Sequence, residues 1–140
     1  MDDKKERTAF GAGTPQTEEN IENSTANNIA ENSGKIKVVF QRPGELSKVL
    51  CIPNTLEAFQ QLVGGYIETL TLPSGFVIVM NEEGRLKGLR ANIISYAGVI
   101  VGNVVITKAE GEDFVSLTPE QIQAARGWLL RHTYEEEKTV

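Results

Sequence analysis

The sequence predicts an α+β fold, in which two helices pack on an antiparallel or mixed sheet of five to six short strands. Short runs rich in β-branched residues alternate with turns that contain glycine or proline, as the strands of a sheet do. Two other segments place apolar residues at helical spacing directly after a residue suited to cap a helix. Charge is unevenly distributed, which predicts a disordered acidic tail before this domain.

The charge distribution sets the expected boundaries. Residues 1–34 carry seven acidic and three basic side chains and few large apolar ones, so they are expected to be too polar to fold alone. Residues 35–134 carry ten basic and nine acidic side chains and are expected to form a single domain. Residues 135–140 form an acidic C-terminal tail. A nearly neutral domain argues against a dedicated duplex-DNA binder, which needs a clustered basic face.

A hairpin is expected at the start of the domain. Residues 35–40 have the β-branched content of a strand. Pro43 and Gly44 then favour the two central positions of a type II turn. Residues 46–52 return as the second strand.

The first helix is expected to begin at Asn54, whose side chain can cap it, with Glu57 closing a capping box. Apolar residues then recur at helical spacing. Gly64 and Gly65 end the helix, because glycine accepts the left-handed conformation, and their small size lets a ligand approach the backbone.

Two further strands follow this helix. Residues 66–72 alternate in character, and the apolar run 76–80 is typical of a strand buried on both faces. Residues 81–84 read as a hairpin turn with Gly84 in the left-handed conformation. Residues 85–89 are expected to return as a short strand.

The next segments are less clearly signalled. Residues 91–96 are compatible with either a helical turn or a loop. Residues 99–106 are apolar, and the glycine at position 102 suggests a bulge or a close approach of two backbones. Residues 114–116 read as a short extended piece.

The last helix has the strongest signals. Thr118 is the expected N-cap, Pro119 suits the first helical position, and Gln121 completes a capping box. The helix is expected to run to about His132.

Composition limits the chemistry. One histidine and one cysteine exclude an internal disulfide and a zinc cluster within the chain. Cys51 is expected to be a small core residue. No apolar run approaches the length of a membrane span, so a cytoplasmic protein without a membrane partner is expected. We expect no catalytic residues, no metal and no cofactor; an enzyme would instead require Glu68 to be buried in a closed pocket.

The predicted ligand-binding site is built around three cations. Arg85 and Lys87 share a face if their segment is a strand, and Arg90 joins them if the chain bends. Such a group of cations is able to bind phosphate or an acidic partner, although a solvated strand face is the simpler interpretation. The predicted set comprises Tyr66, Glu68, Asn81, Arg85, Lys87, Arg90 and Asn92.

Three parts of the sequence together resemble a known family. They are NTLEAFQQLVGGYIE (54–68), NEEGRLKGLRAN (81–92), and IVG (100–102) with DFVSLT (113–118). The family is the domain of unknown function 3846, whose members are small proteins of phages, plasmids and conjugative elements. Arg90 departs from the pattern, which has a proline there, so the local turn is expected to differ.

The resemblance implies a small α/β domain in a bacterial mobile element and supplies no catalytic residues. Two hypotheses follow. The first is a non-enzymatic accessory protein of the host cytoplasm, anti-defence or host-modulating, that binds a nucleotide-like small molecule. The alternative is an inhibitor or regulator that binds a host enzyme or defence protein. A homo-oligomer is left open.

Overall fold

The computed structural model describes residues 34–136. The predicted N-terminal tail, apart from Gly34, lies outside this range, as do the last four residues of the chain. Within it, neither helix has the length and apolarity that crossing a membrane requires.

The described residues form two helices and eight strands, all antiparallel, which confirms the α+β class. The elements are β1 (Lys35–Gln41), β2 (Lys48–Pro53), α2 (Leu56–Val63), β3 (Ile67–Thr71), β4 (Val77–Asn81), β5 (Ala91–Ser95), β6 (Gly98–Val101), β7 (Val104–Glu110), β8 (Asp113–Val115) and α3 (Pro119–His132). The main sheet has six strands in the order β2-β1-β7-β4-β3, with β8 paired to β7, and β5 and β6 form a separate hairpin. The six strands of the main sheet agree with the five to six that were expected, and the β5–β6 hairpin adds two more.

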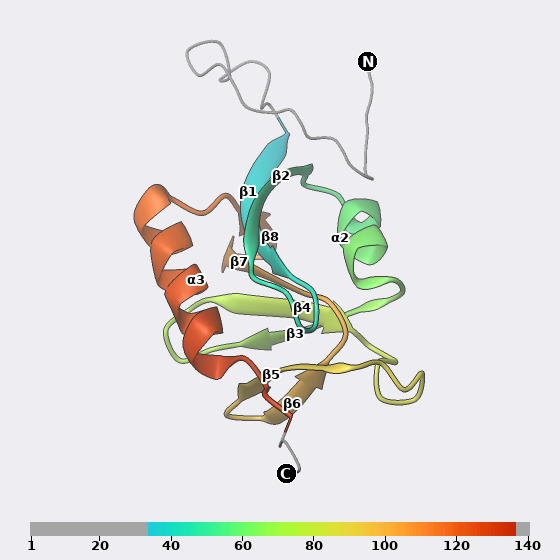
Figure 1. Cartoon of the computed structure of the whole chain (residues 1–140). Coiled ribbons are helices and arrows are strands. Elements are labelled where there is room, and N and C mark those ends of the chain that lie inside the picture. Colours follow the sequence, from blue (N-terminus) through green and yellow to red (C-terminus); the bar gives the residue numbers. More distant parts are fainter. Residues whose placement is uncertain (1–33, 137–140) are drawn as a thin grey trace. The chain divides into compact units, whose positions relative to one another are not determined.

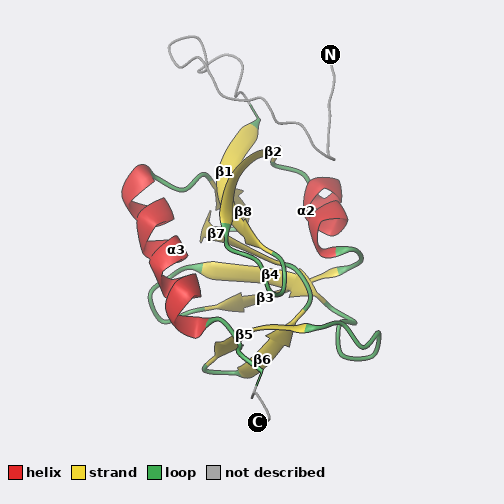
Figure 2. Ribbon diagram, viewed as in Figure 1, coloured by secondary structure: helices red, strands yellow, loops and turns green. Residues whose placement is uncertain are grey.

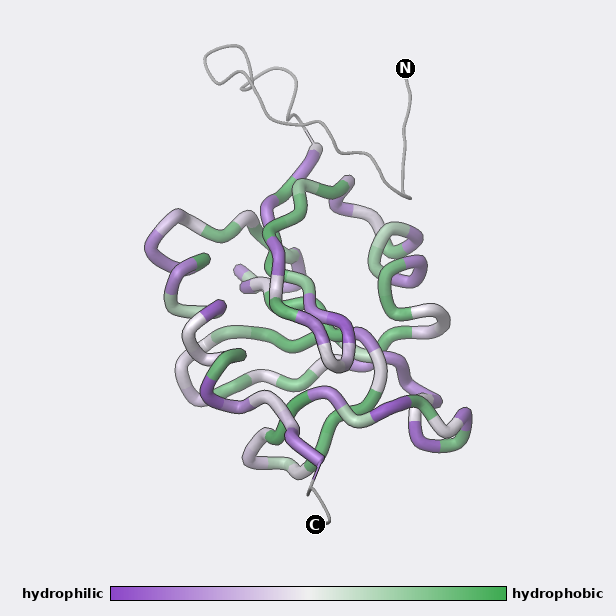
Figure 3. The backbone as a smooth tube through the Cα atoms, in the orientation of Figure 1, coloured by the Kyte–Doolittle hydropathy of each residue, from purple (hydrophilic) through white to green (hydrophobic). Residues whose placement is uncertain are grey.

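The central strands of the main sheet are buried on both faces, with α2 on one side and α3 on the other (Figures 1 and 2). In β4, Val77 and Val79 pack in the cluster that contains Phe59 of α2. Ile78, between them, packs in the cluster that contains Leu129 of α3. This confirms the prediction that the apolar run 76–80 is a central strand, and β4 is hydrophobic along most of its length (Figure 3).

The β5–β6 hairpin completes the α3 side of the molecule. Ile93 and Ile100 belong to the same buried cluster as Ile78 and Leu129. The chain leaving α3 also contacts β5, because Tyr134 donates a backbone hydrogen bond to the carbonyl of Asn92 at 2.8 Å. The ambiguous segment 91–96 is therefore mainly a strand, stabilised by contacts distant in the sequence.

Gly102 divides the apolar run 99–106 into two strands. Its φ is +81°, in the left-handed region, and a Cβ there would lie 2.8 Å from Cδ1 of Leu89. The expected bulge or close approach of two backbones is therefore corrected: Gly102 lies in the turn between β6 and β7, and its close neighbour is the Leu89 side chain.

The expected strand 85–89 is wrong. The backbone forms one helical turn, in which Lys87 donates to the carbonyl of Glu83 at 2.9 Å. Gly88 ends the turn at φ +69°, with the bonds Gly88 N–H to Arg85 O and Leu89 N–H to Gly84 O that define a Schellman motif.

Gly84 also has a different role from the one predicted. It does not adopt a positive φ, so turn conformation does not require glycine there. A Cβ at Gly84 would lie 2.8 Å from Cγ2 of Val101. Glycine at this position allows the 82–90 loop to pack closely against β6.

The hairpin and first helix follow the sequence closely, with two corrections. Glu45 donates to the Arg42 carbonyl at 3.1 Å and Gly44 has φ +78°, as the type II turn requires. The N-cap of α2 is Thr55 rather than Asn54, because the Thr55 hydroxyl accepts from Ala58 N–H at 3.2 Å. The N3 position is therefore Ala58, so Glu57 does not close the expected capping box. Asn54 instead donates to the carbonyl of Phe114 at 2.9 Å. Gly64 ends α2 as expected, at φ +83°.

Cys51 is exposed, which corrects its assignment to the core. Strand β2 lies at an edge of the sheet. Its buried residue, Ile52, faces α2, and successive side chains of a strand point to opposite faces. Cys51 therefore faces away from the α2 core.

The capping box of α3 is confirmed. Thr118 Oγ1 accepts from Gln121 N–H at 3.2 Å, and the Gln121 side chain accepts from Thr118 N–H at 2.9 Å. Replacing Thr118 by alanine is expected to lower the free energy of unfolding by about 1 kcal/mol, because it removes the cap. Urea unfolding measures this loss. The exposed mid-helix residue Gln123, changed to alanine, is the control, and an equal loss in both variants would contradict the role of the cap.

Candidate functional site

Two grooves lie on either side of the 82–90 loop, and Asn81 borders both. We call them the Arg85 groove and the Arg90 groove. The first lies on the α3 side of the main sheet, where β3 and β4 face β6. The second lies near the C-terminal end of α2.

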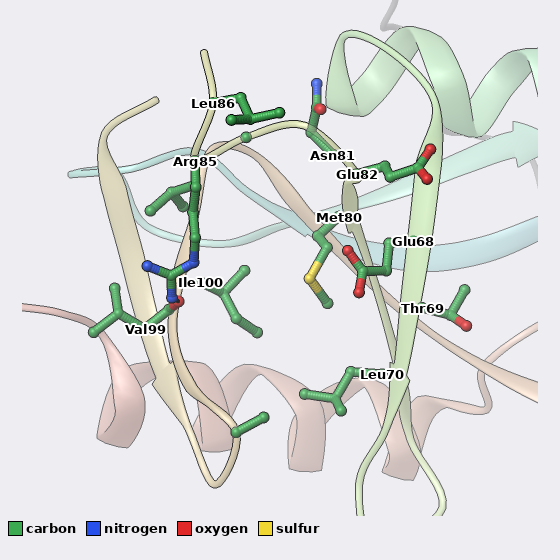
Figure 4. A pocket seen from close by; sticks show the side chains of 13 residues that line it. Glu68, Thr69, Leu70, Met80, Asn81, Glu82, Arg85, Leu86, Val99 and Ile100 are labelled. Carbon is green, nitrogen blue, oxygen red and sulfur yellow. Dashed lines mark hydrogen bonds between the residues drawn. The ribbon is translucent and has the colours of Figure 1, made fainter. Parts of the chain in front are cut away.

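The Arg85 groove has a volume of about 230 Å³ and an apolar floor. Leu70, Met80 and Ile100 form this floor. Glu68 and Arg85 project from opposite walls, Glu68 from β3 and Arg85 from the 82–90 loop (Figure 4). The groove therefore presents two carboxylates, those of Glu68 and Glu82, and one guanidinium around an apolar surface.

Strand register places Glu68 in the groove. Glu68 pairs with Met80, and Leu70 pairs with Ile78, so these four side chains share one face of the β3–β4 pair. Ile78 lies in the α3-side core. Glu68 is exposed, because β3 is the last strand of the sheet.

The backbone of β6 holds Arg85 in position. The Arg85 guanidinium donates a hydrogen bond to the carbonyl of Val99. Within residues 34–136, the ion pairs join Arg42 to Glu45 and Lys87 to Glu83. Arg85 and Glu68 thus face each other without forming a salt bridge, and both charges remain open to a ligand.

Leu86 and Tyr66 are exposed near this region. Leu86, at the tip of the loop, borders the groove and is 89% exposed. Tyr66 precedes β3, is exposed, and lines neither groove. Tyr66, which was expected to begin the strand 66–72, therefore lies just before β3.

The Arg90 groove has a volume of about 320 Å³ and contains the other two cations of the predicted trio, Lys87 and Arg90. Its other lining residues are neutral: Pro43, Val63, Gly64, Asn81, Leu89, Gly102 and Asn103. The three cations do not form one cluster, because the helical turn separates Arg85 from Lys87 and Arg90.

The two predicted asparagines are buried and bonded within the fold. Asn81 donates to the Val63 carbonyl at 3.0 Å and accepts from Glu83 N–H at 2.7 Å. Asn92, which is 1% exposed, lies in the core rather than beside the cations. Its amide groups bond to Gln41 and to the Gly102 carbonyl. We therefore expect Asn92 to stabilise the fold and not to contact a ligand.

Three residues that the sequence interpretation missed belong to the grooves. Met80 was taken only as part of a buried strand, and Leu86 as part of a returning strand. Asn103 lines the Arg90 groove and donates to the Leu62 carbonyl at 2.9 Å. An asparagine directly after a turn-forming glycine was the available signal for Asn103.

The part of the chain that the structure describes holds no cluster of three or more His, Cys, Asp or Glu side chains suited to a metal ion. His132 stacks on Trp128, with ring centroids 4.1 Å apart, and its Nδ1 lies 2.8 Å from the Trp128 carbonyl. This histidine is thus engaged with α3 itself.

A family model described as "Domain of unknown function (DUF3846)" matches residues 36–130. The chain belongs to this family. The match confirms the resemblance seen in the sequence motifs, and both grooves lie within the DUF3846 region. No curated protein and no solved structure matches the chain.

Proposed function

We propose that this DUF3846 protein binds a nucleotide-like small molecule in the Arg85 groove. The observation that carries the proposal is the placement of Glu68 and Arg85 across an apolar floor without a salt bridge between them. A nucleotide has a flat base with N–H groups at one end and phosphate at the other. The groove offers a complementary partner for each part.

Each side chain has a defined role in this arrangement. The base lies over Met80, whose thioether makes favourable contacts with aromatic rings. Glu68 accepts hydrogen bonds from the base, and the Arg85 guanidinium donates to the phosphate. Ligand sites usually measure about 300–1,000 Å³, so a groove of about 230 Å³ favours a mononucleotide over a larger ligand.

Binding without catalysis fits the surroundings of Glu68 better. Carboxylates that act as general acids or bases usually depend on a sheltered environment that tunes their proton affinity. Glu68 is exposed in an open groove. We therefore propose a non-enzymatic accessory protein.

The proposed biological setting rests on the family resemblance. The family resemblance implies a protein of a phage, plasmid or conjugative element. A small nucleotide-binding protein of such an element would act in the cytoplasm of the bacterial host, where it would sequester a nucleotide signal. This makes an anti-defence or host-modulating role the best-supported setting.

The second candidate is a protein that inhibits or regulates a host enzyme or defence protein. The observation that favours it is Leu86, which is 89% exposed beside the groove. An exposed apolar side chain at a loop tip is a suitable anchor for a protein partner. Replacing Leu86 by alanine would then weaken partner binding strongly, whereas nucleotide binding, which depends on Glu68 and Arg85, should fall far less.

Thermal unfolding against a panel of mono-, di- and cyclic nucleotides tests the first proposal. A ligand at about 100 times its Kd adds about 2.7 kcal/mol, which raises the Tm of a domain of this size by several degrees. Arg85→Ala is expected to weaken binding about tenfold to a hundredfold, because it removes a charge-assisted hydrogen bond. Glu68→Gln should change the preference among bases.

Arg131→Ala is the matched control, since Arg131 is exposed on α3 and lines neither groove. Its affinity should equal that of the wild type. The proposal is rejected if no nucleotide raises the Tm, or if Arg85→Ala binds as well as the Arg131 control.

A further inference from the structure

We propose that the Arg90 groove is a second binding site, which takes the diphosphate group of a small molecule. Four segments that are distant in the sequence meet there: the β1–β2 turn, the end of α2, the 82–90 loop and the β6–β7 turn. This site uses no residue of the Arg85–Glu68 pair. This proposal can therefore be tested independently of the function proposed above.

Two glycines set the positions of the two cations. A Cβ at Gly44 would lie 2.7 and 2.9 Å from the terminal nitrogens of Arg90, so the guanidinium lies directly against the turn. A Cβ at Gly65 would lie 3.2 Å from Lys87 Nζ and 3.0 Å from the Asn81 amide nitrogen. Gly65 does not adopt a positive φ, so its backbone conformation does not require glycine. The space it leaves admits the Lys87 ammonium group.

Two of the helix carbonyls that would repel an anion are already hydrogen-bonded. The C-terminal end of a helix carries partial negative charge on its unpaired carbonyls. Here Asn103 donates to the Leu62 carbonyl at 2.9 Å, and Asn81 donates to the Val63 carbonyl at 3.0 Å. No carboxylate lines the groove. The end of α2 therefore tolerates an anion beside it.

Both cations are available to a ligand. Within residues 34–136, the Arg90 side chain has no hydrogen bond and no ion pair. Lys87 pairs with Glu83 at 3.7 Å, but both side chains are nearly half exposed. Exposed pairs of this kind contribute little, so phosphate oxygens can replace the Glu83 carboxylate.

The geometry favours two phosphates over one. Arg90 suits bidentate binding of one phosphate, and Lys87 supplies a point charge for a second. Pro43, Val63 and Leu89 make part of the wall apolar. The diphosphate belongs either to free pyrophosphate or to a nucleoside diphosphate bound at this groove.

NMR titration of the full-length protein with pyrophosphate tests the site. We expect saturable shifts at the amides of Gly44, Gly65, Lys87 and Asn103, with a Kd of about 1 mM or tighter. Arg90→Gln and Lys87→Gln should each weaken binding about tenfold. Arg131→Gln removes a cation elsewhere and should have no effect. The Tm of each variant, measured without ligand, verifies that it is folded.

Two further arms separate the possible sources and the two proposals. In Arg90→Gln, weakened affinities for both pyrophosphate and ADP would assign the diphosphate of ADP to this groove. A weakened pyrophosphate affinity with an unchanged ADP affinity would assign the groove to free pyrophosphate. Arg85→Ala should retain pyrophosphate binding even where nucleotide binding is lost. Unsaturable shifts, or equal weakening in Arg131→Gln, would refute the site.

Discussion

Replacing Asn92 by alanine is expected to lower the free energy of unfolding by about 3 kcal/mol, because it leaves several buried polar groups without partners. Asn92 accepts from the Gln41 side-chain amide at 2.9 Å. It also donates to the carbonyls of Gln41 at 2.9 Å and Gly102 at 2.7 Å. Asn92 is 1% exposed, so water cannot replace these bonds in the folded state.

Urea unfolding measures this loss, and two variants make the comparison specific. Asn92→Asp keeps the size of the side chain but replaces the amide nitrogen by an oxygen, which cannot donate a hydrogen bond. It should therefore lower the free energy of unfolding at least as much as alanine does. Asn103→Ala removes one bond at a half-buried position and should cost about 1 kcal/mol. A loss below about 1 kcal/mol for Asn92→Ala would show that the buried network contributes little.

The Asn92 network also supports the Arg90 groove. Gly102 donates its N–H to the Arg90 carbonyl at 2.7 Å, while its own carbonyl accepts from Asn92. Arg90 and Asn92, which are two positions apart in the chain, thus hold the β6–β7 turn from one side. Asn92 affects the groove through this turn, although its own side chain is buried away from any ligand.

Much of the fold was predictable because its signals are local. The capping box of α3 and the glycine that ends α2 involve neighbours in the sequence, and both appear as expected. The run 76–80 is apolar without alternation, and such a run favours burial on both faces. Strand β5 was not predictable, because its stability comes from contacts with the chain after α3 and with the main sheet.

The site was predicted less well than the fold, and the reason is the geometry of one turn. Alternating residues such as Arg85, Leu86 and Lys87 imitate a strand. The Asn81 side chain and Gly88 instead favour a helical turn. Residues two apart share a face on a strand but point about 200° apart on a helix. Arg85 and Lys87 therefore enter different grooves, although both were correctly chosen as exposed cations.

The burial of Asn81 and Asn92 could not be predicted from the sequence either. Asn81 and Asn92 flank the cations in the chain, and an asparagine at such a place is compatible with a ligand contact. Their actual partners include Val63 and Gln41, which lie 18 and 51 residues away. Only the tertiary fold brings these groups together, so spacing along the chain does not reveal them.

Replacing Phe59 by alanine is expected to lower the free energy of unfolding by about 4 kcal/mol, because truncating a buried aromatic side chain leaves a cavity. Phe59 is 1% exposed, and its ring centroid lies 4.9 Å from that of Phe114. Helix α2 has eight residues, too few to be stable alone. Its buried anchors are Phe59 and Val63.

The same substitution should separate the two grooves. Val63 and Gly64, at the end of α2, line the Arg90 groove, whereas the Arg85 groove lies on the α3 side of the sheet. Under conditions where Phe59→Ala remains folded, amide exchange in α2 should accelerate and pyrophosphate affinity should fall. Nucleotide affinity should change little. Leu56→Ala, on the same helix but 55% exposed, is the control and should alter neither property. An equal loss of pyrophosphate affinity and nucleotide affinity in Phe59→Ala would show that loosening α2 disturbs both faces of the sheet.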